Sequence, residues 1–318
     1  MNNSKEKVKL DEILKYLFST SNKVLIKLLN GVFNENFNED EVDLTVSNNE
    51  FIEDTLSVIR GDMFFDIRKN ESKKASYHLE FQTKNDNTMV IRMFEYGFKK
   101  GKEASILDKD SEIETMYFPN QKVIFFEQNK NINDILQLKI IFPNEQEIIY
   151  AVEVLKYWEL TNEDLIKRKM YPLIPLQLFS LRKELETAQR KNDVNKIKDL
   201  SYISKNLAEK LAREAKDLFS ENEILGEDFH KMLLAIQNLI EYLNRNYFKD
   251  DKLEEEVNTM TKTLYDPEVE KKGFEQGVLA TKIENAKNLL DLLDDETISS
   301  KLDLDIEIVK KLRFENNN

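Results

Sequence analysis

Carboxylates lie on one face of each of two neighbouring stretches of this 318-residue sequence. Because side chains alternate sides along a β-strand, Asp62 and Asp66 share one face of the first stretch, and Glu80 lies on the polar face of the second. The opposite face of each stretch is apolar. If the two stretches pair as a hairpin, their polar faces lie together and these carboxylates converge on one small volume. Clustered oxygen ligands of this kind suit Mg²⁺ or Mn²⁺.

An arginine stands in the apolar stripe of the segment that follows. Residues 88–102 predict an amphipathic helix in which Met89, Arg92, Met93 and Tyr96 share one stripe. A packed face normally excludes a charge unless the charge is paired. We therefore expect Arg92 to clamp a site carboxylate or a substrate phosphate, or else to form a structural salt bridge between this helix and the sheet.

These residues carry a family resemblance. The pattern GD-x(17)-E-F-Q, followed by M-x-x-R-x-x-x-Y, resembles the recombination-promoting nucleases and PD-(D/E)XK nuclease family transposases of bacteria. The resemblance covers about residues 10–158 and includes the upstream YLFSTSNKVLIKLLNGVF. It implies a restriction-endonuclease-like mixed sheet flanked by helices. It also implies a Mg²⁺- or Mn²⁺-dependent endonuclease that hydrolyses DNA phosphodiesters and is linked to recombination or mobile elements.

The resemblance implies Asp62, Glu80 and Gln82 as the residues of the site, with Asp62 and Glu80 binding the metal. Asp66 is a second candidate for the aspartate, because it shares the face of Asp62 and the sequence does not determine the hairpin register. Gln82 replaces the lysine of the general PD-(D/E)XK pattern. A glutamine cannot act as a base at neutral pH, but it can orient water or offer its amide oxygen to the metal. Lys84 lies on the same face and could supply the missing positive charge.

Two other classes of function remain open. Solvent-facing residues of an amphipathic hairpin would give the same alternation, so the chain could be a catalytically silent DNA-binding or oligomeric scaffold, or a structural protein without a nucleic-acid role. The net charge of −13 counts against a nucleic-acid binder, which usually carries a basic surface. Phosphate contact is local, however, and lysines cluster near the candidate site, either as phosphate contacts or as a solvated face. These are Lys69, Lys73, Lys74, Lys84, Lys99, Lys100 and Lys102.

Composition narrows the chemistry. With 41% hydrophobic and 34% charged residues, the sequence suits a helix-rich globular protein. The absence of cysteine excludes disulfides, a thiolate zinc site and a cysteine nucleophile, and two histidines are too few for a multi-histidine metal site. Any metal must therefore be held mainly by carboxylates. The sequence has neither an apolar run long enough for a membrane span nor an apolar signal-peptide core at its N-terminus, so we expect a cytoplasmic protein.

The remaining patterns predict an α/β or α+β fold followed by an all-helical C-terminal region. Helical spacing runs through residues 10–33, with a break at Ser19–Ser21 and Gly31 as a plausible end signal, although the spacing can continue to Phe33. Further strands are expected at residues 42–46, 122–126, 137–142 and 147–157.

After Thr161, a helix-cap candidate with Asp164 three residues later, helical patterns dominate. We expect a nuclease-like domain over residues 1–160, a helical region over 161–265 and a C-terminal tail over 266–318. The tail resembles a helix–turn–helix at residues 295–312 but lacks the basic surface of a recognition helix. We therefore interpret it as a packing or oligomerisation module, through which the chain could form a homo-oligomer.

Overall fold

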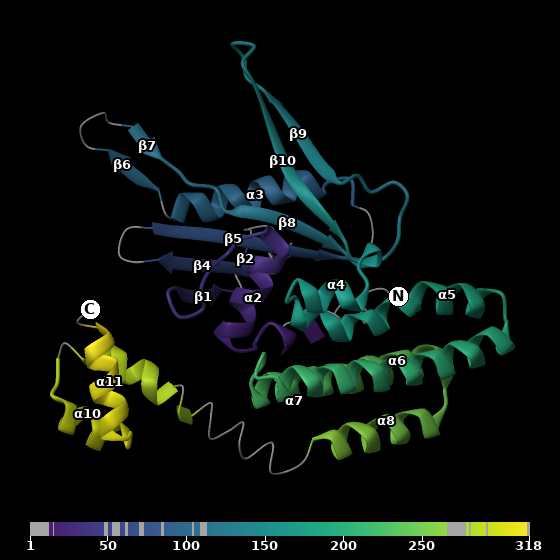
Figure 1. Ribbon diagram of the computed structural model, residues 1–318. Coiled ribbons are helices and arrows are strands. Elements are labelled where there is room, and N and C mark those ends of the chain that lie inside the picture. Colours follow the sequence, from purple (N-terminus) through teal and green to yellow (C-terminus); the bar gives the residue numbers. More distant parts are fainter. Residues whose placement is uncertain are drawn as a thin grey trace. The chain divides into compact units, whose positions relative to one another are not determined.

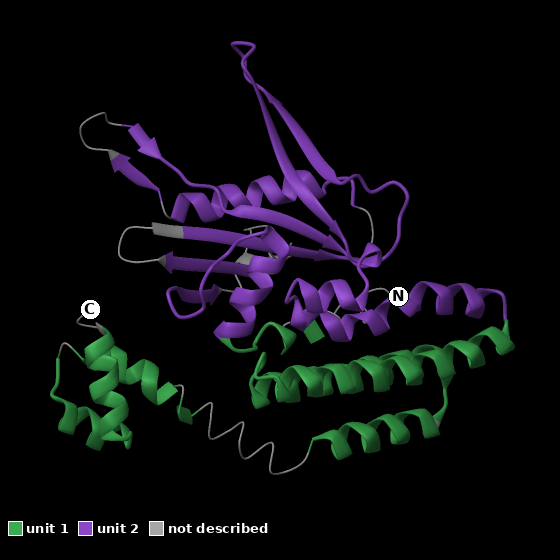
Figure 2. Cartoon of the chain, viewed as in Figure 1, with its two compact units in different colours: residues 1–21, 193–318 green, residues 22–192 purple. Residues whose placement is uncertain are grey.

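A computed structural model of the protein describes residues 13–14, 16–47, 50–52, 58–60, 63–69, 73–83, 86–103, 105–108, 113–265, 278–279, 281–290 and 292–316. The chain divides into two compact units (Figure 2). Residues 22–192 form one of them, here called the sheet unit. Residues 1–21 and 193–318 form the other, here called the helical unit.

A six-stranded mixed sheet forms the centre of the sheet unit (Figure 1). Its strand order is β1-β4-β5-β8-β10-β9, in which β5, β8 and β10 are parallel and the other pairs are antiparallel. The strands are β1 (Asp43–Ser47), β4 (Met63–Lys69), β5 (Lys73–Gln82), β8 (Asn120–Phe125), β9 (Ile135–Ile141) and β10 (Glu147–Lys156). The predicted combination of a mixed sheet, flanking helices and a helical C-terminal region is therefore confirmed.

Helices cover both faces of this sheet. Helix α3 (Met89–Glu103) connects the parallel strands β5 and β8 and packs on one face, where its apolar stripe joins a buried cluster with residues of three strands. Helix α2 (Asn22–Phe33) lies on the other face, where the Phe33 ring contacts the Tyr77 ring at 4.9 Å between centroids. The buried cluster under α3 contains Phe64, Met89, Met93, Tyr96, Val123, Phe125, Ile132 and Val152.

Short elements complete the sheet unit. Two small hairpins pair β2 (Glu50–Ile52) with β3 (Val58–Arg60) and β6 (Ile106–Asp108) with β7 (Ile113–Thr115). After the sheet come the 3₁₀ segment η1 (Tyr157–Glu159), helix α4 (Asn162–Lys167), the 3₁₀ segment η2 (Tyr171–Leu181) and helix α5 (Arg182–Arg190). Thr161 and Asp164 form the reciprocal capping box that their spacing predicts at the start of α4.

The described part of the helical unit contains three long helices and a π-helical segment, in the order α6 (Val194–Ser220), α7 (Gly226–Leu243), η3 (Asn244–Phe248) and α8 (Asp251–Leu264). Near the C-terminus, α10 (Asp295–Leu302) and α11 (Ile306–Asn316) are separated by a short turn, as the sequence predicts. They share a small core of their own with residues from 283 to 293. Within the described ranges, no helix is both long and apolar enough to cross a membrane.

Helix α2 does not end at Gly31. It continues to Phe33, and Asn34 then adopts a left-handed conformation with φ of 58°. Gly31 is instead a position of close approach, because a Cβ atom added there would lie 2.1 Å from the carbonyl oxygen of Arg168. The Arg168 side chain returns the contact by donating to the Gly31 carbonyl at 2.7 Å.

This close approach predicts the effect of adding one methyl group. Alanine normally stabilises a helix relative to glycine, but we expect Gly31→Ala to lower the free energy of unfolding by about 1–3 kcal/mol, because backbone must move to admit the methyl group. Urea denaturation of the wild type and the variant measures the change. Lys23→Ala, at an exposed position of the same helix, should stay within about 0.5 kcal/mol of the wild type. A stabilised Gly31→Ala variant would contradict the packing described here.

Candidate functional site

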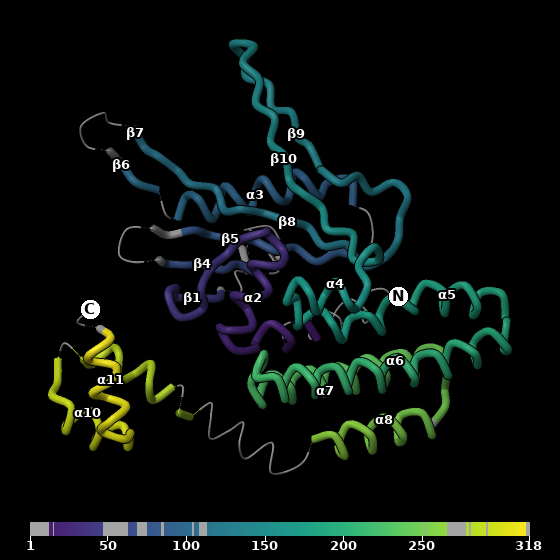
Figure 3. The backbone as a smooth tube through the Cα atoms, in the orientation of Figure 1, coloured from purple at the N-terminus to yellow at the C-terminus, as the bar shows by residue number. Residues whose placement is uncertain are grey.

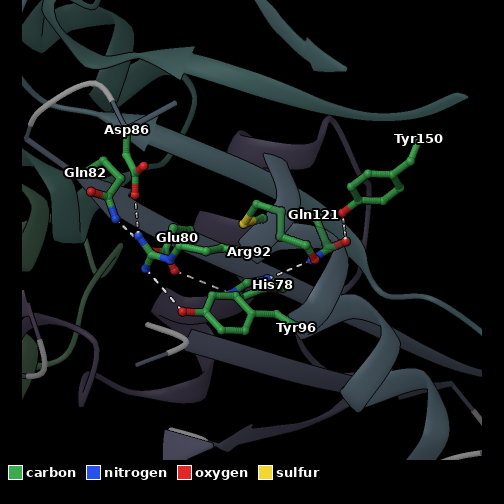
Figure 4. A network of polar contacts seen from close by, with 9 residues as sticks. His78, Glu80, Gln82, Asp86, Arg92, Tyr96, Gln121 and Tyr150 are labelled. Atoms are coloured by element: carbon green, nitrogen blue, oxygen red, sulfur yellow. Dashed lines mark hydrogen bonds and ion pairs between the residues drawn. The ribbon is translucent and has the colours of Figure 1, made fainter. Parts of the chain in front are cut away.

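Glu80 lies at the centre of the candidate site, in the strand that pairs with β4 on one side and β8 on the other. Its side chain faces α3 and is fully buried. The alternation of polar and apolar residues along its strand would equally fit a hairpin with a solvent-facing polar side. Its Oε1 atom accepts a hydrogen bond from the Gln82 amide at 2.6 Å and one from Arg92 Nη2 at 2.9 Å (Figure 4). The polar face of the hairpin is thus an interior surface beneath a helix.

Arg92 links this strand to α3 through several groups. Beyond Glu80, it donates to Asp86 Oδ2 at 3.2 Å and to the Tyr96 hydroxyl at 3.2 Å (Figure 4). Asp86 also accepts from the backbone and hydroxyl of Thr88, the residue directly before α3. Burial alone would lower the pKa of Arg92, but the Glu80 carboxylate, then Tyr96 and Asp86, produce a net rise. The guanidinium is therefore charged at any ordinary pH and neutralises the buried carboxylate.

The Gln121 amide, oriented by a backbone carbonyl of α3, determines the tautomer of His78. The Gln121 amide nitrogen donates to the Met93 carbonyl at 2.8 Å and lies 3.0 Å from His78 Nδ1. A carbonyl can only accept, so the Gln121 NH₂ group must face Met93, and its amide oxygen accepts from the Tyr150 hydroxyl (Figure 4). The second hydrogen of the NH₂ group then points to His78 Nδ1, which must be the acceptor. The proton of the neutral imidazole is therefore on Nε2.

This protonated nitrogen is directed at the site carboxylate. His78 Nε2 lies 3.9 Å from Glu80 Oε2, beyond hydrogen-bond distance but close enough for an electrostatic attraction. The ring is fully buried and stacks on Phe64 at 4.2 Å between centroids. Burial, followed by the positive charge of Arg92, lowers the pKa of His78 from its ordinary 6.5 to about 3. His78 is consequently a neutral N–H dipole near neutral pH.

The hairpin register separates Asp66 from Glu80. Met63 pairs with Leu79, and Asp66 pairs with Ser76, which is four residues before Glu80 and therefore about 13 Å away along the strand. Asp66 accepts from the Ser76 hydroxyl and forms a salt bridge of 3.1 Å with Lys100. The prediction that Asp66 and Glu80 converge on one small volume is therefore wrong. The register brings the start of β4, not its middle, beside Glu80.

Two of the other predicted site residues, Gln82 and Arg92, contact Glu80. Arg92 therefore binds a site carboxylate, which was one of its expected roles. Asp62 and Lys84 lie outside the described residues. Among the clustered lysines, Lys100 is buried against Asp66 and so is not part of a solvated face. Gln121 and Tyr150 were missed by sequence reasoning, because they belong to separate strands and no spacing in the sequence connects them to His78.

The oxygen atoms of Glu80 and Gln82 are chemically suited to bind a divalent cation. Glu80 offers a carboxylate and Gln82 an amide oxygen, and hard oxygen ligands are those that Mg²⁺ and Mn²⁺ prefer. Restricted to the described ranges, which omit Asp62, no group of three or more acidic or histidine side chains is arranged to hold a metal. Any metal at Glu80 would also share this carboxylate with Arg92.

Comparisons with protein-family models, with curated proteins and with solved structures found no significant match to this chain.

The lowered pKa of His78 predicts a loss of stability in acid. The unfolded chain binds a proton at His78 below about pH 6.5, whereas the folded chain does so only near pH 3. The stabilisation from the neutral ring is complete above pH 6.5 and falls as the pH drops toward 3. We expect about 2 kcal/mol less stability at pH 5 than at pH 7.5 from this group.

Urea titrations at both pH values of the wild type and His78→Gln measure this contribution, since the variant has lost the titrating ring. His230→Gln is the matched control, because this second histidine belongs to the helical unit, where it stacks on Tyr265. It should keep the pH dependence of the wild type. Equal pH dependence in the wild type and His78→Gln would contradict a buried, neutral His78.

The Arg92–Glu80 contact predicts strong coupling between the two charges. Arg92→Met leaves the buried carboxylate without its cation and should lower the free energy of unfolding by about 3 kcal/mol. Adding Glu80→Gln should recover most of that loss, because both charges are then removed. A thermodynamic double-mutant cycle gives the coupling energy. Arg213→Met breaks the exposed Arg213–Glu209 pair and should cost less than about 0.5 kcal/mol. Additive effects at Arg92 and Glu80 would contradict the coupling.

Proposed function

We propose that this protein is a metal-dependent DNA endonuclease of the PD-(D/E)XK type, related to the recombination-promoting nucleases of mobile elements. The observation that carries the proposal is the buried Glu80 on β5, which Gln82 of the same strand and an arginine of the next helix both contact. Among the described residues of the motif, Gln82 and Arg92 thus meet at one oxygen atom of Glu80. A mixed sheet between helices is compatible with a restriction-endonuclease-like fold, which is part of the proposal.

In this proposal Glu80 and Asp62 hold the cation, and DNA is the partner. When bound, Mg²⁺ or Mn²⁺ would supply an activated water and charge stabilisation on the phosphate. Gln82 orients the water through its amide, which cannot remove a proton. Lys84 contributes positive charge near the phosphate. We propose that the enzyme acts in the cytoplasm.

Arg92 has two chemical roles open to it in such a site. Its guanidinium now neutralises Glu80, and it also reaches Asp86, so it has a second carboxylate to retain it. Its planar donors suit a phosphate as well as a carboxylate. We propose that Arg92 compensates Glu80 in the free protein and contacts the DNA phosphate when a cation takes over the charge of Glu80.

One observation favours a second candidate function, a catalytically silent DNA-binding or oligomeric scaffold. Arg92 already supplies the positive charge that Glu80 needs, so the contact satisfies the carboxylate without a metal. In such a protein the Arg92–Glu80 contact has only a structural role, which is to hold α3 on the sheet. Metal binding separates the two functions, because only the nuclease requires a cation at Glu80.

The nuclease predicts metal-dependent cleavage of DNA that requires Glu80. We expect purified protein to cleave supercoiled plasmid with Mg²⁺ or Mn²⁺ but not with EDTA, and Glu80→Gln and Asp62→Asn to lose at least about 100-fold in rate, because each removes a ligand of the cation. Gel electrophoresis measures the conversion. Glu209→Gln, at an exposed carboxylate of α6, is the matched control and should cleave as the wild type does.

Two outcomes would overturn the nuclease. Folded wild type that cleaves in no condition would favour the scaffold, which predicts DNA retention without metal that falls steeply as salt rises. Cleavage that survives both substitutions would show that the activity does not come from this site.

A further inference from the structure

Strand β9 forms one end of the sheet and leaves an open edge. It pairs with β10 on one side, and no strand of the described ranges lies along its other side. Figures 1 and 3 show the β9–β10 hairpin reaching away from the remaining strands of the sheet unit. Ile135 and Ile141, at the two ends of β9, are 48% and 63% exposed. A long edge strand with exposed apolar side chains is a template for another strand unless something covers it.

Hydrogen bonds show which residues point to the open edge. Phe142 N–H donates to the Gln146 carbonyl and Val154 N–H donates to the Asp134 carbonyl, so even-numbered residues bond across to β10. Hydrogen-bonded positions alternate along an antiparallel strand. The odd-numbered residues of β9 therefore direct their N–H and C=O groups outward. These are Ile135, Gln137, Lys139 and Ile141.

The outward residues are self-complementary. If a second β9 lies antiparallel to the first with its twofold axis at Leu138, Ile135 is opposite Ile141 of the second copy and Gln137 is opposite Lys139 of the second copy. All of the outward residues then form hydrogen-bonded pairs. On the other face, Leu136 is opposite Ile140 of the second copy. Apolar side chains thus meet apolar ones, and no like charges oppose each other.

Neighbouring registers are poorer. Moving the axis to Lys139 places two lysines directly opposite each other, which is destabilising, and it leaves Ile135 without an outward partner in β9. Moving it to Gln137 pairs Ile135 with Lys139 and leaves Ile141 without one. Lys139 forms a salt bridge of 2.6 Å with Glu147 of β10, so its charged group lies over its own hairpin. The register centred on Leu138 is therefore the one that the sequence of β9 favours.

We propose that β9 pairs with β9 of a second copy of this chain, so that two six-stranded sheets join into one continuous sheet across a twofold axis at Leu138. The interface combines main-chain hydrogen bonds with the exposed isoleucines at its two ends. It differs from the C-terminal helices that the sequence suggests for self-association, and it does not depend on the nuclease proposal.

Analytical ultracentrifugation of the full chain tests this dimer. We expect a concentration-dependent rise from the 37.6 kDa monomer to twice that mass. Gln137→Pro should abolish it, because proline removes an outward N–H while leaving the bonds to β10, as edge strands tolerate. Gln137→Thr, which keeps that N–H, should still dimerise. Circular dichroism verifies that both variants are folded.

A charge pair tests the register itself. Gln137→Lys creates a lysine opposite Lys139 of the second copy and should weaken dimerisation about tenfold, whereas Gln137→Glu should strengthen it about tenfold and lose this gain in high salt. Wild type that stays monomeric at all concentrations would overturn the proposal. A dimer that persists in Gln137→Pro, or that responds equally to both charges, would also overturn it and would direct attention to the C-terminal helices.

Discussion

The sheet unit depends on the compensation of one buried carboxylate. Glu80 lies at full burial on an interior strand, where an isolated charge would be costly. Arg92 meets this requirement from α3, and it does so only if the helix crosses the sheet with its first turns above β5. Asp86 accepts from Thr88, directly before α3, and also from Arg92, so the entry into the helix and the position of the charge are set together.

The neutral polar groups around Glu80 connect three parallel strands. Tyr150 on β10, Gln121 on β8 and His78 on β5 form a hydrogen-bonded chain that ends at the site. The Met93 carbonyl orients the Gln121 amide, and this amide makes His78 Nδ1 an acceptor and the Tyr150 hydroxyl a donor, so the tautomer of the histidine depends on a backbone group of α3. A one-residue slip of any of these strands would turn its member to the opposite face. The chain therefore ties the register of the sheet to the electrostatics around Glu80.

Much of the local structure follows from patterns in the sequence. Residue types predicted strands at 42–46, 122–126 and 147–157, which the structure has at 43–47, 120–125 and 147–156. The Thr161–Asp164 spacing predicted a cap that the structure contains. Helical spacing placed Arg92 in the apolar stripe of its helix, and this position predicted, among other roles, a pairing with a carboxylate. The structure contains that pairing, with Glu80. These features are local because they depend on residues three or four positions apart or on the alternation of a single strand.

The sequence by itself determined which side chains share a strand face or a helix stripe, since backbone geometry repeats every two or 3.6 residues. Only the tertiary structure decided what covers each face. Alternation gives the same pattern for a solvated and a buried polar face, and α3 makes this one interior. The hairpin register separated Asp66 from Glu80, and the order of the strands joined His78, Gln121 and Tyr150. Such contacts between distant segments arise from pairing and packing, and local periodicity carries no information about them.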